Sequence, residues 1–206
     1  MSGILAVGFA FVISNANYFG KDVFVSLATS YAVSVIFYLM IVWVPTRSRK
    51  ARIKRSAIAH YKEFKIEVMG LLLHAAKEGW TSEDRERLVD PGAFTEYFTA
   101  DETGSGMRWY EVLNGLDDYY VSEIALRLDM LRSEIQFVLD SIEIEDEELF
   151  LFMKRLSRIS QIMSKKSSDY DDVKTWGRFL WGIYANWDAV VGHLNGDQNL
   201  KMFERL

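Results

Sequence analysis

The sequence predicts an all-α protein, with a transmembrane helical hairpin at the N-terminus followed by a cytosolic bundle of helices. Three observations predict this fold class. The first 45 of the 206 residues contain only two charged side chains, Lys21 and Asp22. A cluster of basic residues follows Pro45, and beyond it apolar residues recur at alternating spacings of three and four, the period of a helix. We therefore expect a membrane hairpin over 1–45 and a cytosolic domain over 46–206.

The segment 23–44 is the clearer of two candidate spans, because it contains no charged residue. As a helix, its length is about 33 Å, against roughly 30 Å for the hydrocarbon core of a bilayer. Trp43 lies near its end, where aromatic side chains are enriched at the membrane interface. We expect this helix to cross the bilayer once.

The shorter segment 3–19 is also uncharged, and turn-forming residues separate it from the second span. A signal peptide is one alternative, but it has a positively charged start and no Lys or Arg precedes Lys21. We prefer a second span here, which makes a hairpin. The remaining alternative is a single span preceded by an interfacial or periplasmic helix.

The basic cluster after Pro45 predicts the orientation of the chain, because positively charged flanks stay on the cytoplasmic side. Its members are Arg47, Arg49, Lys50, Arg52, Lys54 and Arg55. We expect a multi-pass protein of the inner membrane with most of its chain in the cytoplasm. The cluster also suits anionic lipid headgroups, and a ligand site there is an alternative.

Hydroxyl side chains recur along the second span, where Ser26, Ser30 and Ser34 are spaced by four residues and Thr29 lies beside them. Small residues at this spacing allow helices to pack closely. The alternative is a weakly polar pore face, which requires a homo-oligomer, such as a tetramer, because two spans cannot enclose a pore. The absence of ionisable residues in mid-membrane argues against a proton relay.

The cytosolic part is predicted as a series of helices. A basic juxtamembrane helix covers 47–78. Thr81 and Asp84 form a capping box for a short helix ending near Val89. Pro91 begins another short helix through Tyr97, and 101–106 is a polar, glycine-containing loop.

Three longer helices are expected in the C-terminal half. The first has a coiled-coil-like apolar seam from Val121 to Ile142, which packs either inside the domain or against a sister subunit. The second begins at the acidic run 145–148, which suits a helix N-terminus, and extends to Met163. The last begins near Asp169, has a buried line that reaches Val191, and is ended by Gly196, after which a short polar tail follows.

No motif for catalysis or metal binding is present in the sequence. The chain has no cysteine, and His60, His74 and His193 lack partners at metal-ligand spacing. No serine nucleophile elbow, Walker A loop or EF-hand loop occurs. We therefore expect no enzyme, no metal and no cofactor, and the net charge of −5 argues against DNA binding.

Basic side chains with aromatic neighbours are the remaining candidate ligand site. Such groups can bind the phosphates of a nucleotide and stack on its bases. Ordinary helix packing is the alternative, because cations are common at helix C-terminal ends and tryptophans are common in cores. The candidate residues are Lys154, Arg155, Arg158, Lys165, Lys166, Lys174, Trp176 and Arg178.

This layout of uncharged 3–19 and 23–44, basic 47–55 and a helical remainder resembles one group of proteins. These are the small all-helical membrane effectors of type III CRISPR antiviral systems. The resemblance concerns the architecture of the whole chain and includes no diagnostic motif, and the Rossmann-like sensing domain of the commoner effectors is missing. It implies cytosolic domains that oligomerise and bind cyclic oligoadenylate, after which the membrane part perturbs the bilayer.

Two functional hypotheses follow. In the first, the chain is an oligomeric, ligand-gated membrane effector that senses an anionic nucleotide such as cyclic oligoadenylate. In the second, it is a membrane-anchored scaffold that docks a protein partner or a sister copy through the seam from Val121 to Ile142. The sequence alone does not choose between them.

Overall fold

The computed structural model describes residues 21–77, 79–101, 107–188, 192–193 and 196–206. The chain divides into two compact units, one ending at Ala51 and the other comprising Arg52–Leu206. This boundary lies six residues after the one expected from the sequence. The predicted first span, 3–19, lies outside the described residues, and so does most of the expected loop 101–106.

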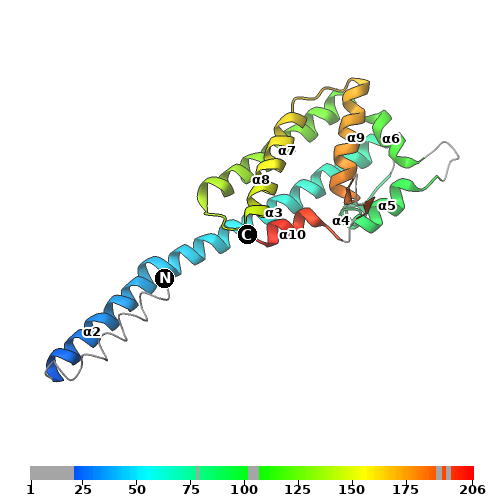
Figure 1. The fold of residues 1–206 in the computed structure, drawn as a ribbon. Helices are drawn as coiled ribbons and strands as arrows, with labels where there is room; N and C mark the ends of the chain where they lie inside the picture. The colour runs from blue at the N-terminus through cyan, green and yellow to red at the C-terminus, as the bar shows by residue number, and fades with distance from the viewer. Residues whose placement is uncertain (1–20, 78, 102–106, 189–191, 194–195) are drawn as a thin grey trace. The chain divides into compact units, whose positions relative to one another are not determined.

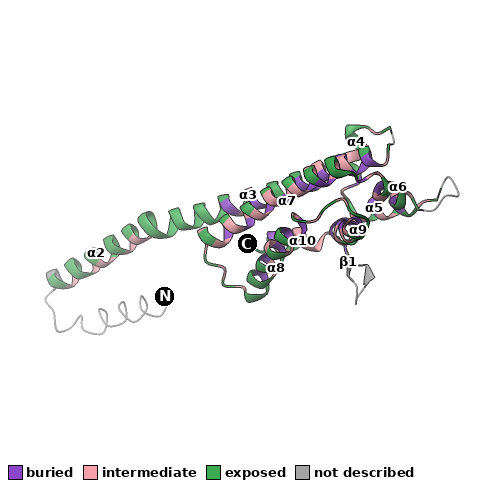
Figure 2. Ribbon diagram, turned by 90° about the horizontal axis from the view of Figure 1, so that it is seen from above, coloured by how far each residue is buried: buried purple, intermediate pink, exposed green. Residues whose placement is uncertain are grey.

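The described part of the first unit is helical. It contains α2 (Lys21–Tyr38), the π-helical turn η1 (Leu39–Trp43) and the start of α3 (Val44–Ala75). The only described helix that is long and apolar enough to cross a membrane begins at Val23, and its most apolar stretch has a mean hydropathy of 2.0 and no buried residue. Figure 2 shows this stretch as mostly exposed.

Pro45 accounts for the π-helical turn that precedes it. Proline lacks an N–H group, and in an α-helix its ring clashes with the carbonyl four residues earlier, here that of Ile41. The N–H of Val44 bonds instead to the carbonyl of Leu39, five residues back, which widens the turn. The Thr46 hydroxyl donates to the carbonyl of Val42 at 2.7 Å. The helix therefore continues through Pro45 without a break, because the wider π-helical turn precedes the proline.

The second unit contains α3 from Arg52 onward and seven further helices in its described part. They are α4 (Ser82–Arg87), α5 (Pro91–Thr99), α6 (Arg108–Gly115), α7 (Asp118–Ser141), α8 (Glu147–Met163), α9 (Tyr170–Tyr184) and α10 (Gln198–Glu204). Figure 1 shows their arrangement. The described strands are β1 (Trp187–Asp188) and β2 (Gly192–His193), a short antiparallel pair.

Local signals set the ends of several helices, and the signals at α4 and α5 are the ones that the sequence predicted. Thr81 caps α4 through a capping box with Asp84, and Pro91 occupies the first turn of α5 behind the N-cap Asp90. The carboxylates of Asp117 and Asp146 accept backbone N–H groups at the starts of α7 and α8. Each cap satisfies donors that a helix N-terminus leaves without partners.

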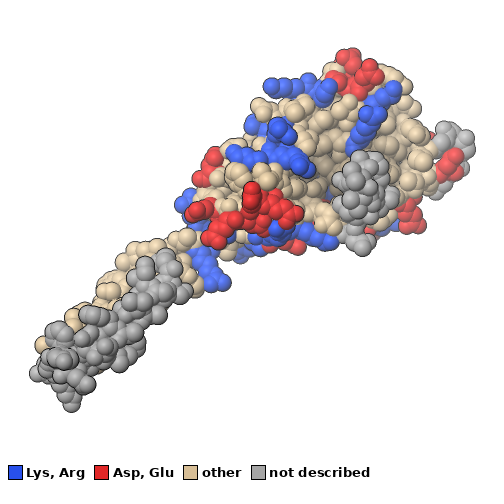
Figure 3. All heavy atoms as spheres, in the orientation of Figure 1, with Lys and Arg blue, Asp and Glu red and all other residues tan. Residues whose placement is uncertain are grey.

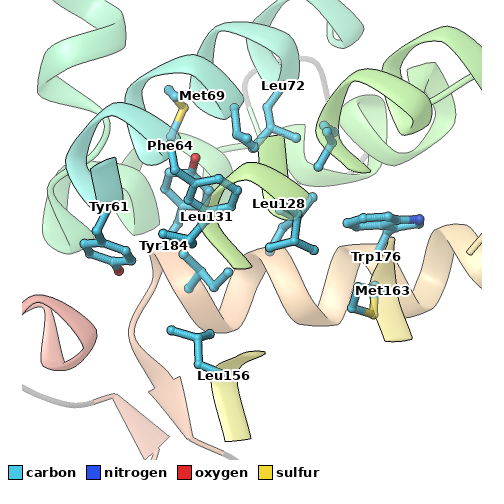
Figure 4. Close-up of a cluster of buried hydrophobic side chains, with 14 of the residues drawn as sticks. Tyr61, Phe64, Met69, Leu72, Leu128, Leu131, Leu156, Met163, Trp176 and Tyr184 are labelled. Atoms are coloured by element: carbon cyan, nitrogen blue, oxygen red, sulfur yellow. The ribbon is translucent and has the colours of Figure 1, made fainter. Parts of the chain in front are cut away.

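The apolar seam of α7 packs inside the second unit, which decides between the two alternatives left by the sequence. Its residues from Val121 to Val138 at the seam positions are at most 4% exposed. They meet apolar residues of α3, α8 and α9, including Phe64, Leu72, Leu156, Met163 and Tyr184 (Figure 4). The seam is therefore unavailable as a docking surface.

An aromatic cluster joins α5, α6 and α9. The ring of Phe94 lies 5.2 Å from those of Trp181 and Tyr184 and 5.7 Å from that of Trp109. Gly115, at the end of α6, approaches the end of α3 so closely that a Cβ would lie 1.9 Å from the carbonyl oxygen of Ala75. Only glycine fits this position, which holds α6 against α3.

Two features of the C-terminal region differ from the sequence prediction. The last long helix ends at Tyr184 and does not extend to Gly196, because Asn186 adopts a left-handed conformation (φ 51°). Its side-chain amide donates to the carbonyl of Gly196 and accepts the N–H of Gln198 at 3.2 Å. The expected polar tail forms α10, capped by Asp197. The sequence prediction also lacked α6.

The buried seam predicts a large difference between two leucines of α7. Replacing Leu128, which is 0% exposed, by alanine should lower the free energy of unfolding by about 2–5 kcal/mol. The matched change at Leu126, which is 52% exposed, should change it by less than about 0.5 kcal/mol. Urea unfolding of the full chain in detergent micelles, followed by circular dichroism, measures both. Equal effects would contradict the assignment of the seam to the core.

Candidate functional site

Three of the predicted ligand-binding cations line one hollow on the outer face of α8. The hollow has a volume of about 500 Å³, and its lining is Leu151, Lys154, Arg155, Ser157, Arg158 and Gln161. All three cations are exposed, and within the described ranges none of them is ion-paired with a carboxylate. Their charges are therefore available to an anion from outside the chain.

The position of the hollow follows from the packing of α8. Its apolar line, which includes Leu149, Met153 and Leu156, faces the core. Residues 154, 155 and 158 point away from that line because they fall on the opposite face of the helix. Figure 3 shows Lys and Arg side chains gathered over α8 and α9, in the orientation of Figure 1.

The hollow also has polar and apolar residues that the sequence prediction lacked. Ser157 and Gln161 add hydrogen-bonding groups, and Leu151 adds an apolar side chain that is 57% exposed. Phe150, beside the hollow, is 39% exposed, and the Lys154 ammonium lies 5.6 Å from its ring. These residues share one helix face with the cations, so their spacing was the signal that could have identified them.

The remaining predicted cations lie outside this hollow. Lys166 is ion-paired with Asp172 at 2.8 Å, and this bond is the main reason that the pKa of Asp172 is lowered. Lys174 lies over the ring of Tyr170 at 3.9 Å. Lys165 and Arg178 are exposed. The structure therefore gathers Lys154, Arg155 and Arg158 and separates the others from them.

Trp176 is the one predicted ligand-binding residue that lies in the core. It is 1% exposed and packs among the buried residues shown in Figure 4. Val173, Trp176 and Leu180 form one inward-facing line on α9, so the same spacing that brings Trp176 near the cations in sequence turns it inward. Its ring is not accessible to a ligand, which corrects the stacking role predicted for it. Tyr170, 75% exposed, is the accessible aromatic on this helix.

The hydroxyls predicted as a packing or pore face all lie on α2 and are exposed: Ser26, Thr29, Ser30 and Ser34. The Thr29 hydroxyl donates to the carbonyl of Val25 at 2.8 Å, and that of Ser34 donates to the carbonyl of Ser30 at 2.9 Å. Bonds of this kind satisfy the hydroxyl donors within the helix itself. The hydroxyl oxygens retain lone pairs for a neighbouring helix or for water.

A buried ion pair lies beside a second cavity, of about 380 Å³, bordered by α3, the α4–α5 connection and the segment before α10. Lys65 donates to Asp197 and to the carbonyl of Val89, both at 2.8 Å, and its side chain is 4% exposed. Tyr61 also donates to Asp197, at 3.0 Å. Burial and the nearby Asp197 carboxylate hold the pKa of Tyr61 well above its usual value, so its hydroxyl remains protonated.

In the described part of the chain, His60 and His74 do not gather with other possible metal ligands. His60 lies 3.7 Å from Glu134 and His74 contacts the ring of Trp80, whereas His193 belongs to β2. In the part of the chain that the structure describes, no three side chains of the types His, Cys, Asp and Glu come together as a metal site would require. The hollow on α8 is thus the best-defined candidate site.

No protein-family model, curated protein or solved structure matches this chain.

The buried pair predicts a strong effect of removing its acid. Asp197→Ala leaves the Lys65 ammonium buried without a counter-charge and should lower the free energy of unfolding by about 3–5 kcal/mol. Asp129→Ala is the matched control, because it breaks the more exposed pair with Arg132 and should have a much smaller effect. Chemical unfolding of the full chain in micelles compares them. Similar losses of unfolding free energy in the two variants would show that the buried pair contributes no more to stability than the exposed pair.

Proposed function

We propose that this chain is an oligomeric membrane effector whose second unit binds an anionic nucleotide second messenger, of the cyclic oligoadenylate class, and perturbs the membrane in antiviral defence. The observation that carries the proposal is the hollow on α8, where Lys154, Arg155 and Arg158 are exposed and carry no ion pair among the described residues. The architectural resemblance of the sequence points in the same direction.

The chemistry of the hollow suits a phosphorylated ligand. Arginine can bind phosphate oxygens through two N–H groups at once, and lysine adds a compact positive charge. Ser157 and Gln161 can hydrogen-bond to sugar or base edges, while Leu151 and the adjacent Phe150 present apolar surface to a base. A purely inorganic anion makes no use of these apolar groups, so the hollow favours a nucleotide.

The membrane part of the proposal rests on the apolar helix from Val23. Its cytoplasmic end is marked by Trp43 and by Arg47, whose guanidinium lies 5.1 Å from the Trp43 ring, a suitable arrangement for the membrane interface. In this proposal the protein is a multi-pass inner-membrane protein with its second unit in the cytoplasm. Several copies, a tetramer in the simplest case, bring α2 and its hydroxyl face together.

A second candidate function, a membrane-anchored scaffold, is favoured by one observation on α7. Its outer face carries Tyr119, Leu126, Met130 and Phe137, each more than half exposed. An apolar line of this kind on a helix is suited to the apolar groove of a protein partner. In this alternative the partner contacts the outer face of α7, because the predicted seam is buried.

The ligand proposal predicts that the three hollow cations dominate nucleotide binding. Replacing Lys154, Arg155 and Arg158 together by glutamine should weaken the binding of cyclic tetra-adenylate at least a hundredfold, because each charged hydrogen bond contributes about 1.5–3 kcal/mol. Calorimetric titration of the full chain in lipid nanodiscs measures the affinity.

The matched control replaces Lys165, Lys174 and Arg178 by glutamine, which removes the same charge outside the hollow. It should change the affinity by less than about threefold, since these residues make no contact within the hollow. Equal weakening in both triple variants indicates bulk attraction and contradicts a site on α8. A wild-type chain that binds no cyclic oligonucleotide contradicts the proposed function.

The membrane proposal predicts that a charge in the middle of the apolar helix prevents its stable insertion. Val33→Arg places a cation near the bilayer centre, at a cost of about 2.5–3.5 kcal/mol on an insertion scale. More of this variant should be extracted from membranes by alkali. Thr46→Arg, next to the basic cluster, should behave like the wild type. Equal extraction of all three chains contradicts a span at 23–44.

A further inference from the structure

The exposed face of α8 carries acids at its start and bases in its later turns. Glu147 and Glu148 occupy the first turn, and Lys154, Arg155 and Arg158 follow. Figure 3 shows acidic and basic side chains next to one another in this region. Leu151, 57% exposed, lies between the two groups. Along the helix axis, the first part of this face is therefore acidic and the later part is basic.

Around the helix, each side of Leu151 carries both acidic and basic residues. At about 100° per residue, Glu148 and Arg155 lie about 60° and about 40° to the same side of Leu151. Glu147, Lys154 and Arg158 lie on its other side, within about 60°. Along the axis, Glu148 precedes Leu151 by three residues and Arg155 follows it by four. Each flank thus has an acid before the centre and a base after it.

Such a face is complementary to itself in one orientation. When two α8 helices pack antiparallel about a two-fold axis near Leu151, each flank faces the same flank of the other copy with its direction reversed. Glu148 then faces the partner's Arg155, and Glu147 faces the partner's Lys154 and Arg158. In a parallel pair Glu148 faces the partner's Glu147 and the bases face one another, so like charges repel.

We infer that two copies of this chain pair through antiparallel α8 helices, with Leu151 of each at the centre. Glu148 is already held on the surface by Arg205 at 2.8 Å, and its side chain remains 74% exposed. This bond orders the acid before a second copy arrives, which reduces the entropy lost on pairing. The hollow cations, which carry no ion pair among the described residues, acquire counter-charges in the dimer.

The pairing regulates the binding of a ligand in the hollow, and this part of the inference rests on the proposed function. The acids of a second copy occupy the same three cations that a phosphorylated ligand needs. Ligand binding and pairing through α8 are therefore mutually exclusive at each hollow, and by linkage each weakens the other. Binding of the ligand releases α8 from its partner, which changes the assembly of the chains in the membrane.

Charge reversal tests the pairing without any ligand. Glu148→Arg and Arg155→Glu, each alone in the full chain in micelles, should weaken dimerisation at least tenfold in mass photometry. The two changes together in one chain restore both contacts and should recover the dimer. An equal mixture of the two single variants should do the same as a heterodimer. Glu96→Arg, an exposed acid on α5, is the control and should leave dimerisation unchanged.

Single reversals that dimerise like the wild type, or a double variant that is as weak as the single ones, exclude the proposed contacts. A Glu96→Arg variant as weak as Glu148→Arg shows only a dependence on net charge and also excludes them. Circular dichroism of each variant confirms that these surface changes leave the helices folded.

Cross-linking tests the register, because the chain has no cysteine of its own. Leu151→Cys introduces a single thiol near the two-fold axis, and oxidation should give a disulfide-linked dimer. Leu126→Cys, similarly exposed on the outer face of α7, should form no disulfide-linked dimer. A dimer from Leu126→Cys and none from Leu151→Cys identifies α7 as the interface and overturns the proposal.

Addition of cyclic tetra-adenylate separates the pairing from the proposed function. The ligand should lower the yield of the Leu151→Cys cross-link at least tenfold. Binding without any change in this yield overturns the regulation of the hollow. A chain that cross-links as expected but binds no ligand contradicts the proposed function and supports the pairing on its own.

Discussion

The buried ammonium group of Lys65 determines which segments of the second unit must meet. A charge that is 4% exposed requires an opposite charge and further hydrogen-bond acceptors nearby, because its loss of hydration is otherwise too unfavourable. Asp197 and the carbonyl of Val89 meet this requirement. The Tyr184 ring lies 5.2 Å from the ammonium, and its hydroxyl donates to the Lys65 carbonyl at 2.6 Å. One residue of α3 thus holds α9, the α4–α5 connection and the C-terminal segment.

This arrangement explains why the chain ends in a helix and not in a loose tail. Asp197 is both the counter-ion of Lys65 and the N-cap of α10, whose Leu200 N–H it accepts at 2.9 Å. Once Asp197 is fixed on α3, Phe203 is brought over Tyr61, with ring centroids 5.1 Å apart. Arg205 then reaches Asp146 and Glu148 at the start of α8. The acidic end of the α8 face is therefore held in place by the same contacts that close the core.

The sequence predicted those parts of the fold that depend on near neighbours. The capping box of Thr81 and Asp84, the first-turn Pro91 and the three-four spacing of α7 act within a few residues, and each appears in the structure. The end of α9 could not be predicted in this way, because Asn186 bonds with Gly196 and Gln198, ten and twelve residues later. Helical spacing also could not distinguish an outward from an inward Trp176, since burial depends on which face meets α7 and α8.

In the candidate site too, some features follow from helical spacing and others depend on contacts with another segment. That Lys154, Arg155 and Arg158 share a face follows from spacing alone, whereas the loss of Lys166 from the set depends on its ion pair with Asp172 across the α8–α9 connection.

Exposed carboxylates form weak, salt-sensitive pairs with such cations. The phosphates of a nucleotide bind arginine through paired, charge-assisted hydrogen bonds. A phosphorylated ligand can therefore displace a second copy from the hollow of α8, because the weaker acid contacts yield to the stronger phosphate contacts. An exchange of this kind converts the binding of a small anion into a change in how the chains associate.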